Sequence, residues 1–229
     1  MAEHANEGPA RTFLQPIAAP SILGLYGFAG STFIVAANLA HWYGTAETPL
    51  FLFPFVAIFG GVAQLSAGLW AYKARDGLAT AMHGMWGSFW IGYGILNVLF
   101  ATGVLSTSNP NFLGGFGYWF IALGFITFTG AIAAQAENLA LAAVLHTLWI
   151  GSALLAIGFL VTGTLNSVWV IIGAWVLILS ALCAWYTASA LMLEGVTGRA
   201  VLPVGMTKTA QQQPAINPGQ GEPGVAKGQ

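Results

Sequence analysis

The stretch at residues 168–193 reads VWVIIGAWVLILSALCAWYTASALML and contains no charged side chain. An α-helix of about 20 mostly apolar residues is long enough to cross the hydrocarbon core of a bilayer. Five more stretches of this kind precede it, separated by short connections that contain breakers or polar residues. The predicted spans are residues 22–42, 49–72, 78–103, 112–134, 139–161 and 168–193. The pattern predicts an all-α integral membrane protein with six transmembrane helices.

The composition excludes several other classes of protein. Of the 229 residues, 57% are hydrophobic and only 6% are charged, whereas about 25% are charged in a typical soluble domain. The single cysteine, Cys183, excludes a disulfide framework and a cysteine-based metal site. The formal net charge is -1 and there is no basic cluster, so nucleic acid is not an expected partner. The surface is therefore expected to face a lipid bilayer.

The basic residues predict an orientation. They lie before the first span, between the second and third, and after the sixth: Arg11, Lys73, Arg75, Arg199, Lys208 and Lys227. With six spans, all of them fall on one side, which the positive-inside rule assigns to the cytoplasm. Five spans and a re-entrant segment would instead place Arg199 outside. We therefore expect both termini in the cytoplasm.

The predicted spans and their orientation divide the chain into three segments. Residues 1–17 are a cytoplasmic N-terminal segment without the charged start and apolar centre of a cleaved signal peptide. Residues 18–205 are expected to form a six-helix transmembrane domain. Residues 206–229 are rich in Gln, Gly and Pro. Because such a composition buries too little apolar surface to order itself, a disordered cytoplasmic tail is predicted there.

A weak internal repeat runs through the odd-numbered spans. Small residues beside bulky ones recur at residues 27–31 (GFAGS), 86–90 (WGSFW) and 148–152 (LWIGS), roughly 60 residues apart. Three helix pairs in the same orientation would place these segments around an axis normal to the membrane. The repeat predicts a central pore with a pseudo-threefold arrangement of helix pairs.

Polar side chains inside the spans are the candidates for contact with a solute. No Lys or Arg lies inside a predicted span, and the acidic residues stay near span ends. A crossing solute would therefore meet hydrogen-bond donors rather than a fixed counter-ion. The candidate donors are Ser31, Thr32, Ser88, Tyr93, Asn97 and Thr147. The alternative for each Ser or Thr is a hydrogen bond to its own or a neighbouring helix.

Asn38, Gln64, His83 and Asn97 either line the pore or have a structural role. Gln64 lies among small residues that let another helix approach closely, which favours an interhelical hydrogen bond. His83, about one turn before Trp86 on the same face, either faces the pore and titrates near neutral pH or packs between helices.

A cofactor and an enzymatic activity are not expected. A haem would need two facing imidazoles at one depth, as His83 and His146 could supply, but nothing else supports it, so no cofactor or metal is predicted. Nucleophile elbows, paired carboxylates, HExxH motifs and phosphate-binding glycine loops are absent from the sequence.

Three motifs resemble the acetate uptake transporter family, which includes bacterial succinate-acetate permeases and fungal ammonia and acetate proteins. Residues 60–73 (GGVAQLSAGLWAYK) are similar to the family pattern GGxAQxxAGLxxYK, residues 87–90 (GSFW) to a segment of its third helix, and residues 198–205 (GRAVLPVG) to GRxVLPxG. The signature NPAPLGL of the first helix is altered to APSILGL at residues 19–25. The resemblance covers about residues 18–205.

The resemblance implies a six-helix protomer, assembled as a homohexamer with one pore per protomer. In the family, Phe, Tyr and Leu side chains from the odd helices typically pinch the pore. These positions fall on Phe28, Trp86 and Leu148, so that Trp86 exchanges a hydroxyl for an indole N–H. A hydrophobic constriction of this kind excludes hydrated ions.

The expected function is uptake of acetate, with succinate as a related substrate, across the plasma membrane by a channel or a proton symport. Because no cation lies within the spans, the neutral acid or the acid with a proton should cross more readily than the free anion. Ser31, Ser88, Tyr93 and Thr147 are the expected substrate-binding residues. Two alternatives stay open: a channel for ammonia or another small neutral solute, and a non-transporting membrane sensor or subunit.

Overall fold

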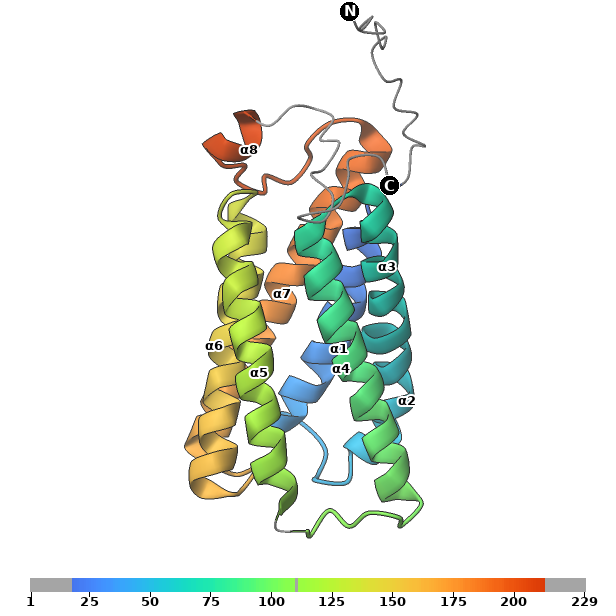
Figure 1. The fold of residues 1–229 in the computed structure, drawn as a ribbon, viewed down its shortest axis with the longest axis vertical. Coiled ribbons are helices and arrows are strands. Elements are labelled where there is room, and N and C mark those ends of the chain that lie inside the picture. The colour runs from blue at the N-terminus through green and yellow to red at the C-terminus, as the bar shows by residue number, and fades with distance from the viewer. Residues whose placement is uncertain (1–17, 110, 213–229) are drawn as a thin grey trace, which may run out of the picture.

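The computed structural model describes residues 18–109 and 111–212, whose helices form a bundle of six rods (Figure 1). The helices are α1 (Pro20–Leu39), α2 (Pro49–Val56), η1 (Ala57–Ala63), α3 (Gln64–Ala74), α4 (Gly77–Ala101), α5 (Asn111–Ala134), α6 (Leu139–Thr162), α7 (Val168–Thr197) and α8 (Lys208–Gln212). The helices α2, η1 and α3 follow one another without a break and make one rod. The six rods begin and end within a few residues of the predicted spans.

Five of the rods are long and apolar enough to cross a membrane: α1, the rod of α2, η1 and α3, then α5, α6 and α7. The remaining rod, α4, has 25 residues and is equally long. Its five glycines and its polar His83, Ser88 and Asn97 lower its hydropathy. The all-α membrane architecture is therefore confirmed for five of the six predicted crossings, and the threefold relation of helix pairs stays a prediction.

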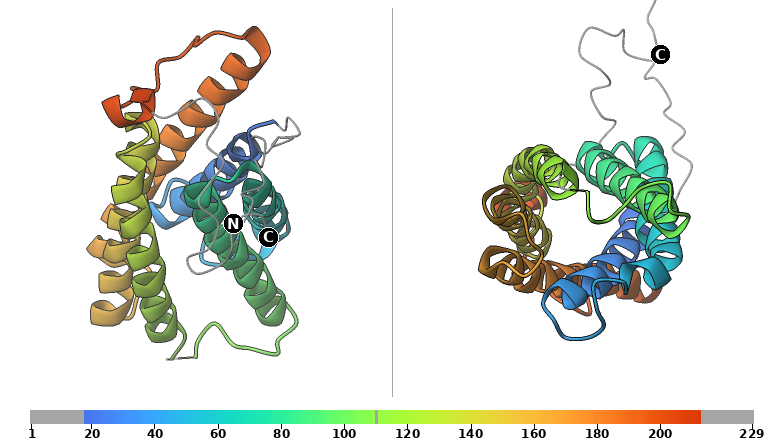
Figure 2. Two further views of the ribbon diagram at one scale, coloured as in Figure 1. Left: turned by 45° about the horizontal axis from the view of Figure 1, so that its top comes forward. Right: turned by 90° about the horizontal axis from the view of Figure 1, so that it is seen from below.

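The rods form a ring. In order around it, α4 packs on α3, then α3 and η1 on α1, α1 on α7, α7 on α6, and α6 on α5. The ring closes between α5 and α4 through a much smaller interface (Figure 2). Because the interface between α4 and α5 is small, each side-chain contact there makes up a larger share of it than at the other sides of the ring.

The second rod contains the π-helical segment η1. Pro54, just before it, has no N–H to donate to the preceding turn. Ser31 of α1 donates a hydrogen bond to the carbonyl of Val56, where α2 ends, at 3.3 Å. At Gly27, a side chain would overlap the carbonyl of Phe59. The glycine therefore allows α1 to lie directly against η1.

Side chains cap two helices at the end of the bundle that is uppermost in Figure 1. Asp76 caps α4 by accepting a hydrogen bond from the N–H of Ala79 at 2.8 Å. Asn138 caps α6 by accepting one from the N–H of Leu141, also at 2.8 Å. Each cap satisfies a backbone donor that the first helical turn leaves free. The two short turns that carry Asp76 and Asn138 are thereby fixed in place.

The chain after α7 returns across this upper end and pairs with the turn between α5 and α6. The N–H groups of Leu139 and Ala140 donate to the carbonyls of Gly205 and Val204, both at 3.0 Å. Thr207 adds a hydrogen bond to the same turn. This pairing gives the segment a defined place that its composition did not indicate.

The prediction of a disordered tail from residue 206 therefore differs from the structure over residues 206–212, which include α8. The rest of that tail, residues 213–229 with Lys227, and the predicted N-terminal segment, residues 1–17 with Arg11, lie outside the described residues.

The outer surface of the ring is apolar. On α1, the large side chain of Leu23 is 49% exposed. On each of the other five long rods, large side chains are more than half exposed, and they include Phe51, Phe55, Leu69, Ile95, Tyr118, Phe125, Val161, Val168 and Trp175. A surface of this extent is unsuited to water and suits lipid or another protein. The protein is thus a multi-pass membrane protein.

Candidate functional site

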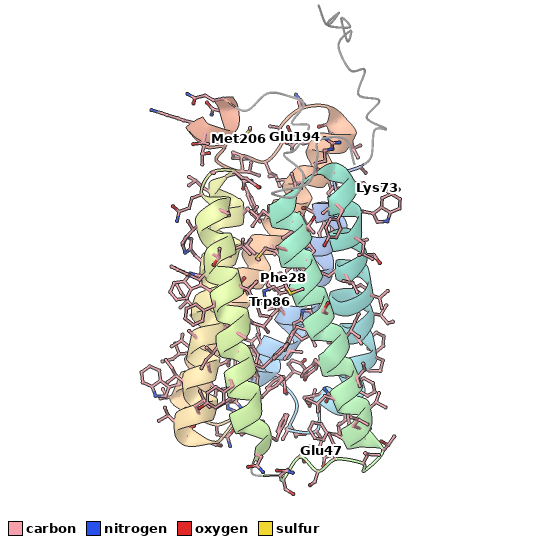
Figure 3. The ribbon with its side chains drawn as sticks, in the orientation of Figure 1. Phe28, Glu47, Lys73, Trp86, Glu194 and Met206 are labelled. Carbon is pink, nitrogen blue, oxygen red and sulfur yellow. The ribbon has the colours of Figure 1, made fainter. Side chains whose placement is uncertain are left out.

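Two cavities lie inside the ring, one towards each end. The lower cavity, towards the end where Figure 3 labels Glu47, has a volume of about 780 Å³. Aromatic side chains make up much of its wall: Trp86, Phe89, Trp90, Tyr93, Phe100, Phe112, Phe116, Phe120 and Phe159. Many of these rings contact one another, as Phe89 and Phe120 do with centroids 5.6 Å apart. The wall of the lower cavity is therefore a connected aromatic cluster.

The upper cavity is smaller and more polar. It has a volume of about 270 Å³ and lies between the first turns of α1 and α4 and the turn that joins α5 to α6. Its polar lining residues are Ser21, Gln64, Asp76, His83, Glu137, Asn138 and Thr187. Both helix-capping side chains of this end thus also face the cavity.

The two cavities meet at the side chains that the sequence predicts as the constriction. Trp86 and Leu148 line both cavities, and Phe28 lines the upper one. The rings of Phe28 and Trp86 meet edge to face with centroids 6.2 Å apart, midway along the bundle (Figure 3). All three side chains are almost completely buried. They come from α1, α4 and α6 and separate the two cavities with apolar surface.

The indole of Trp86 is held by more than packing. Its N–H donates a hydrogen bond to the hydroxyl oxygen of Thr127 on α5 at 2.9 Å, and its ring meets that of Phe89 at 5.3 Å. Thr127 was not predicted as a site residue. Its sequence signal is weak, because a lone Thr in an apolar span is as readily explained by a bond to its own helix.

Four predicted polar residues lie in the wall of the lower cavity: Thr32, Asn38, Tyr93 and Asn97. Asn38 donates to the carbonyls of Tyr43 and Thr45, at 3.0 and 3.3 Å, and so also fixes the loop after α1. Asn97 donates to the carbonyl of Tyr93 at 2.8 Å. Each of the two asparagines therefore has a structural hydrogen bond besides its place in the wall.

Two groups in the lower wall have no hydrogen-bond partner among the described residues. They are the hydroxyl of Thr32 and the indole N–H of Trp90, both buried. An unpaired buried donor is unfavourable by about 1–3 kcal/mol, so water or a solute that enters the cavity gains from pairing with it. Trp90 lies in the GSFW motif, but its N–H was overlooked as a candidate.

Gln64 and His83 lie in the wall of the upper cavity. The Gln64 side-chain oxygen and His83 Nδ1 are buried without a partner among the described residues, while His83 Nε2 lies 3.4 Å from the Ser21 hydroxyl. His146 lies elsewhere and accepts a hydrogen bond from Trp149 at 3.1 Å. The two histidines are therefore not joined in one cavity.

Three of the four predicted substrate-binding residues line neither cavity: Ser31, Ser88 and Thr147. Ser31 is buried against α2, whereas Ser88 is on the exposed face of α4 and donates to its own helix at Gly84. Thr147 donates to the carbonyl of Ala143 at 2.7 Å. Their hydroxyls are used by backbone carbonyls, which is the alternative that the sequence left open.

Acidic groups mark the mouths of the cavities. Glu47 lines the lower one, and Asp76 and Glu137 line the upper one. Burial and the neighbouring carboxylate of Asp76 raise the pKa of Glu137 to about 7. The sequence showed these residues near span ends, but it did not show that the α3–α4 and α5–α6 turns share one cavity.

An apolar constriction between two internal cavities, in a membrane-spanning helical ring, defines a protein built for passage of a small solute. Residues 2–206 match the GPR1/FUN34/yaaH family. The chain belongs to this family, and the predicted resemblance to acetate uptake transporters is confirmed.

Two relatives and one solved structure show how close the likeness is. The chain is 30% identical to the succinate-acetate/proton symporter SatP of Escherichia coli (strain K12) over 190 residues, which are 82% of this chain and 96% of the symporter. It is 29% identical to the meiotically up-regulated gene 86 protein of Schizosaccharomyces pombe over 174 residues, which are 75% of this chain and 57% of that protein. The structure of the bacterial acetate channel SatP matches with a TM-score of 0.73 at 26% identity and covers 83% of this chain and 100% of that one.

Proposed function

We propose that this protein carries acetate and related small carboxylates across a plasma membrane, as the neutral acid or together with a proton. The observation that carries the proposal is the lining of the cavities, where no Lys or Arg of the described residues occurs. A free carboxylate would meet apolar rings and acidic groups there, without a cation to offset its loss of hydration. The neutral acid therefore crosses at a lower free energy.

The relatives support the choice of substrate. A symporter named for succinate, acetate and protons aligns with 82% of the chain, and the solved structure with the same fold is named as an acetate channel. Acetate is the primary substrate in this proposal. Succinate must lose two charges to become neutral, so it should cross less readily by the same path.

The chemistry of the acid sets the expected pH dependence. A small carboxylic acid has a pKa near that of Glu, about 4.3, so only about 1 molecule in 500 is neutral at pH 7. Each unit of acidification above that pKa raises the neutral fraction about tenfold. Uptake therefore rises as the outside is acidified.

The side chains have distinct roles in this proposal. Phe28, Trp86 and Leu148 form the constriction, which excludes hydrated ions because they cannot shed their water there. Tyr93 is retained as a substrate contact below it. Gln64 and His83 meet the acid above it. Ser31, Ser88 and Thr147 do not contact the acid in this proposal. Their hydroxyls stabilise the helices to which they are bonded.

The proposal also includes the finer architecture. We take α4 as a sixth crossing, because it runs beside α3 between the two ends of the bundle (Figure 1). Lys73 and Arg75 lie at the upper end, so the positive-inside rule places that end in the cytoplasm. The apolar outer surface suits neighbouring protomers of a homohexamer as well as lipid. The origin of the three constriction residues in α1, α4 and α6 supports a pseudo-threefold arrangement.

Proteoliposomes test the proposal. The interior is held at pH 7.5, the exterior is varied from 7.5 to 5, and entry of radiolabelled acetate is corrected at each pH for leak through empty liposomes. Protein-dependent entry should rise with acidification and be competed by unlabelled acetate. A flat pH dependence would falsify the coupling to protonation. No protein-dependent entry, with folded protein, would favour a non-transporting sensor or subunit.

A channel for ammonia is the second candidate, because the same charge-free constriction suits any small neutral solute. Ammonia entry raises the pH inside liposomes, which a trapped dye reports. Fast protein-dependent alkalinisation without protein-dependent acetate entry would favour this candidate.

A further inference from the structure

The hydrogen bond between Trp86 and Thr127 has a fixed direction. The Thr127 hydroxyl donates its only proton to the carbonyl of Leu123, one turn earlier on α5, at 2.7 Å. Its oxygen is therefore free to accept, and the indole N–H of Trp86 donates to it at 2.9 Å. Both side chains are buried, with Thr127 0% exposed and Trp86 3% exposed. The bond is therefore shielded from the solvent outside the ring.

Thr127 does not touch a solute. It lines neither cavity, whereas Trp86 lines both. Any effect of the Thr127 hydroxyl on passage must therefore act through the position of the indole.

The bond crosses the weakest side of the ring. Helices α4 and α5 share a small interface, and among the described residues this is the one side-chain hydrogen bond that joins them. The rest of the contact between them is apolar, such as the edge-to-face pair of Phe89 and Phe120. Apolar packing alone permits an indole to tilt, whereas a directed N–H bond selects one orientation.

We infer that Thr127 is a positioning residue that holds the Trp86 indole across the constriction and thereby sets the discrimination between acetate and longer monocarboxylic acids. The transport part of this inference rests on the proposed function. The positioning part does not, because the state of the indole N–H can be observed without transport.

Loss of the Thr127 hydroxyl leaves the indole N–H unpaired in apolar surroundings. The ring then tilts towards a cavity, where water can pair with it, and the apolar wall between the cavities loses its fixed shape. An apolar site discriminates against an extra methylene by about tenfold or more. We expect the preference for acetate over butyrate to fall by about 3- to 10-fold.

Three variants of α5 separate the hydroxyl from the fold. Thr127→Val keeps the shape and removes the acceptor, and Thr127→Ser restores a hydroxyl. Thr129→Val is the matched control, because Thr129 is exposed and bonds only its own helix, at the carbonyl of Phe125. Only Thr127→Val should relax the preference, measured as the ratio of protein-dependent acetate to butyrate exchange in proteoliposomes.

A double variant tests whether Thr127 acts through Trp86. In a Trp86→Phe background, which has no indole N–H, adding Thr127→Val should leave the acetate-to-butyrate ratio unchanged. A further fall of the ratio in the double variant would overturn action through Trp86.

The indole supplies a readout that needs no transport. Protein labelled with ¹⁵N-tryptophan has nine indole signals, and the signal lost in Trp86→Phe belongs to Trp86. In Thr127→Val this signal should shift and exchange faster with solvent, while Thr127→Ser and Thr129→Val leave it in place.

The Trp86 indole signal and the acetate-to-butyrate ratio together show which part of the inference is wrong, if one is. An unmoved Trp86 signal in Thr127→Val would overturn the positioning role. A moved signal with an unchanged acetate-to-butyrate ratio would overturn the role in specificity. A native protein that exchanges no acetate would overturn the proposed function and the specificity role together, while the indole signal would still decide the positioning role.

Discussion

The two cavities differ in size and in chemistry, although one set of apolar side chains separates them. The lower cavity, about 780 Å³, is walled by aromatic rings, and its unpaired buried groups are the hydroxyl of Thr32 and the N–H of Trp90. The upper cavity, about 270 Å³, carries Asp76 and Glu137, and its unpaired atoms include the side-chain oxygen of Gln64. The unpaired groups of the lower wall can therefore donate hydrogen bonds, whereas the upper wall adds two carboxylates and an unpaired amide oxygen as acceptors.

This difference favours a protonated acid over its anion. A carboxylate can only accept hydrogen bonds, so it can pair with the lower wall but not with the acceptors of the upper wall. A neutral carboxylic acid has an O–H that donates and a carbonyl that accepts, so it can pair with both. The asymmetry thus agrees with the proposed passage of the neutral acid, and it can be tested one wall at a time.

The largest expected effect comes from removing the Trp86 side chain, which separates the two cavities. Trp86→Ala should join the cavities, raise protein-dependent acetate exchange about tenfold and abolish the preference over butyrate, because the dewetted constriction is lost. Proteoliposome exchange of both acids measures this. Since truncation of a buried Trp destabilises a fold by about 3–5 kcal/mol, the variant must first be shown to be folded.

Trp70→Ala is the control for this variant. Trp70 is 51% exposed on the outer face of α3 and lines neither cavity. Unchanged exchange in Trp86→Ala, or an equal change in Trp70→Ala, would mean that the cavities are not the path.

The acidic residues at the upper mouth predict that the effect of Glu137 on acetate exchange depends on pH. Because burial and Asp76 raise the pKa of Glu137 to about 7, its carboxyl is mostly neutral at pH 6 and mostly charged at pH 8. In the route in which acetate enters together with a proton, the charged form repels the approaching anion. Glu137→Gln should therefore raise acetate exchange about two- to threefold at pH 8 and leave it unchanged at pH 6.

Equilibrium exchange with the same pH on both sides makes this measurement independent of how the protein is inserted. The ratio of variant to native rate at each pH also cancels the protonation of the substrate. Glu194→Gln is the control, since Glu194 is exposed at the same end and lines neither cavity. A ratio that stays the same from pH 6 to 8 would contradict a role of Glu137 at the mouth.

Most of the fold could be predicted from the sequence because a bilayer imposes one requirement on every crossing. Long apolar stretches such as residues 168–193 have few alternatives to a spanning helix. The helix α4 was predicted as a span at residues 78–103, but its glycines and polar side chains weaken the apolar signal, so that its crossing of the membrane stays a prediction. The order at residues 206–212 was also missed, because it depends on backbone pairing with Leu139 and Ala140, which composition does not reveal.

The sequence predicted the residues of the candidate site correctly where a repeat or a family motif fixes their positions along the chain. The repeat and the family motifs placed Phe28, Trp86 and Leu148 in three helices, and the structure brings these side chains between the cavities. Ser31, Ser88 and Thr147 lie close to them in sequence, but on other faces of their helices. The facing direction of a hydroxyl depends on helix rotation, which adjacency in sequence does not determine.

A further effect should distinguish two threonines that the sequence analysis includes among the candidate donors. Thr32 has an unpaired hydroxyl in the lower wall, whereas the Thr147 hydroxyl is bonded to its own helix. Thr32→Val should raise the half-saturating acetate concentration about 2- to 10-fold through the loss of one hydrogen bond, and Thr147→Val should leave it unchanged. Saturation curves of exchange measure both, and the reverse order would contradict the assignment of the lower wall.

The smallest expected effect is that of Ser88→Ala. Ser88 lies between the wall residues Trp86 and Phe89 in sequence, yet it is exposed and its hydroxyl donates to the carbonyl of Gly84 at 2.8 Å. Exchange of acetate and its preference over butyrate should both equal those of the native protein, because the lost bond is a local helix bond and Ser88 lines neither cavity. A clear change in either quantity would mean that this face of α4 contributes to passage, and the path would then have to include the outer side of the ring.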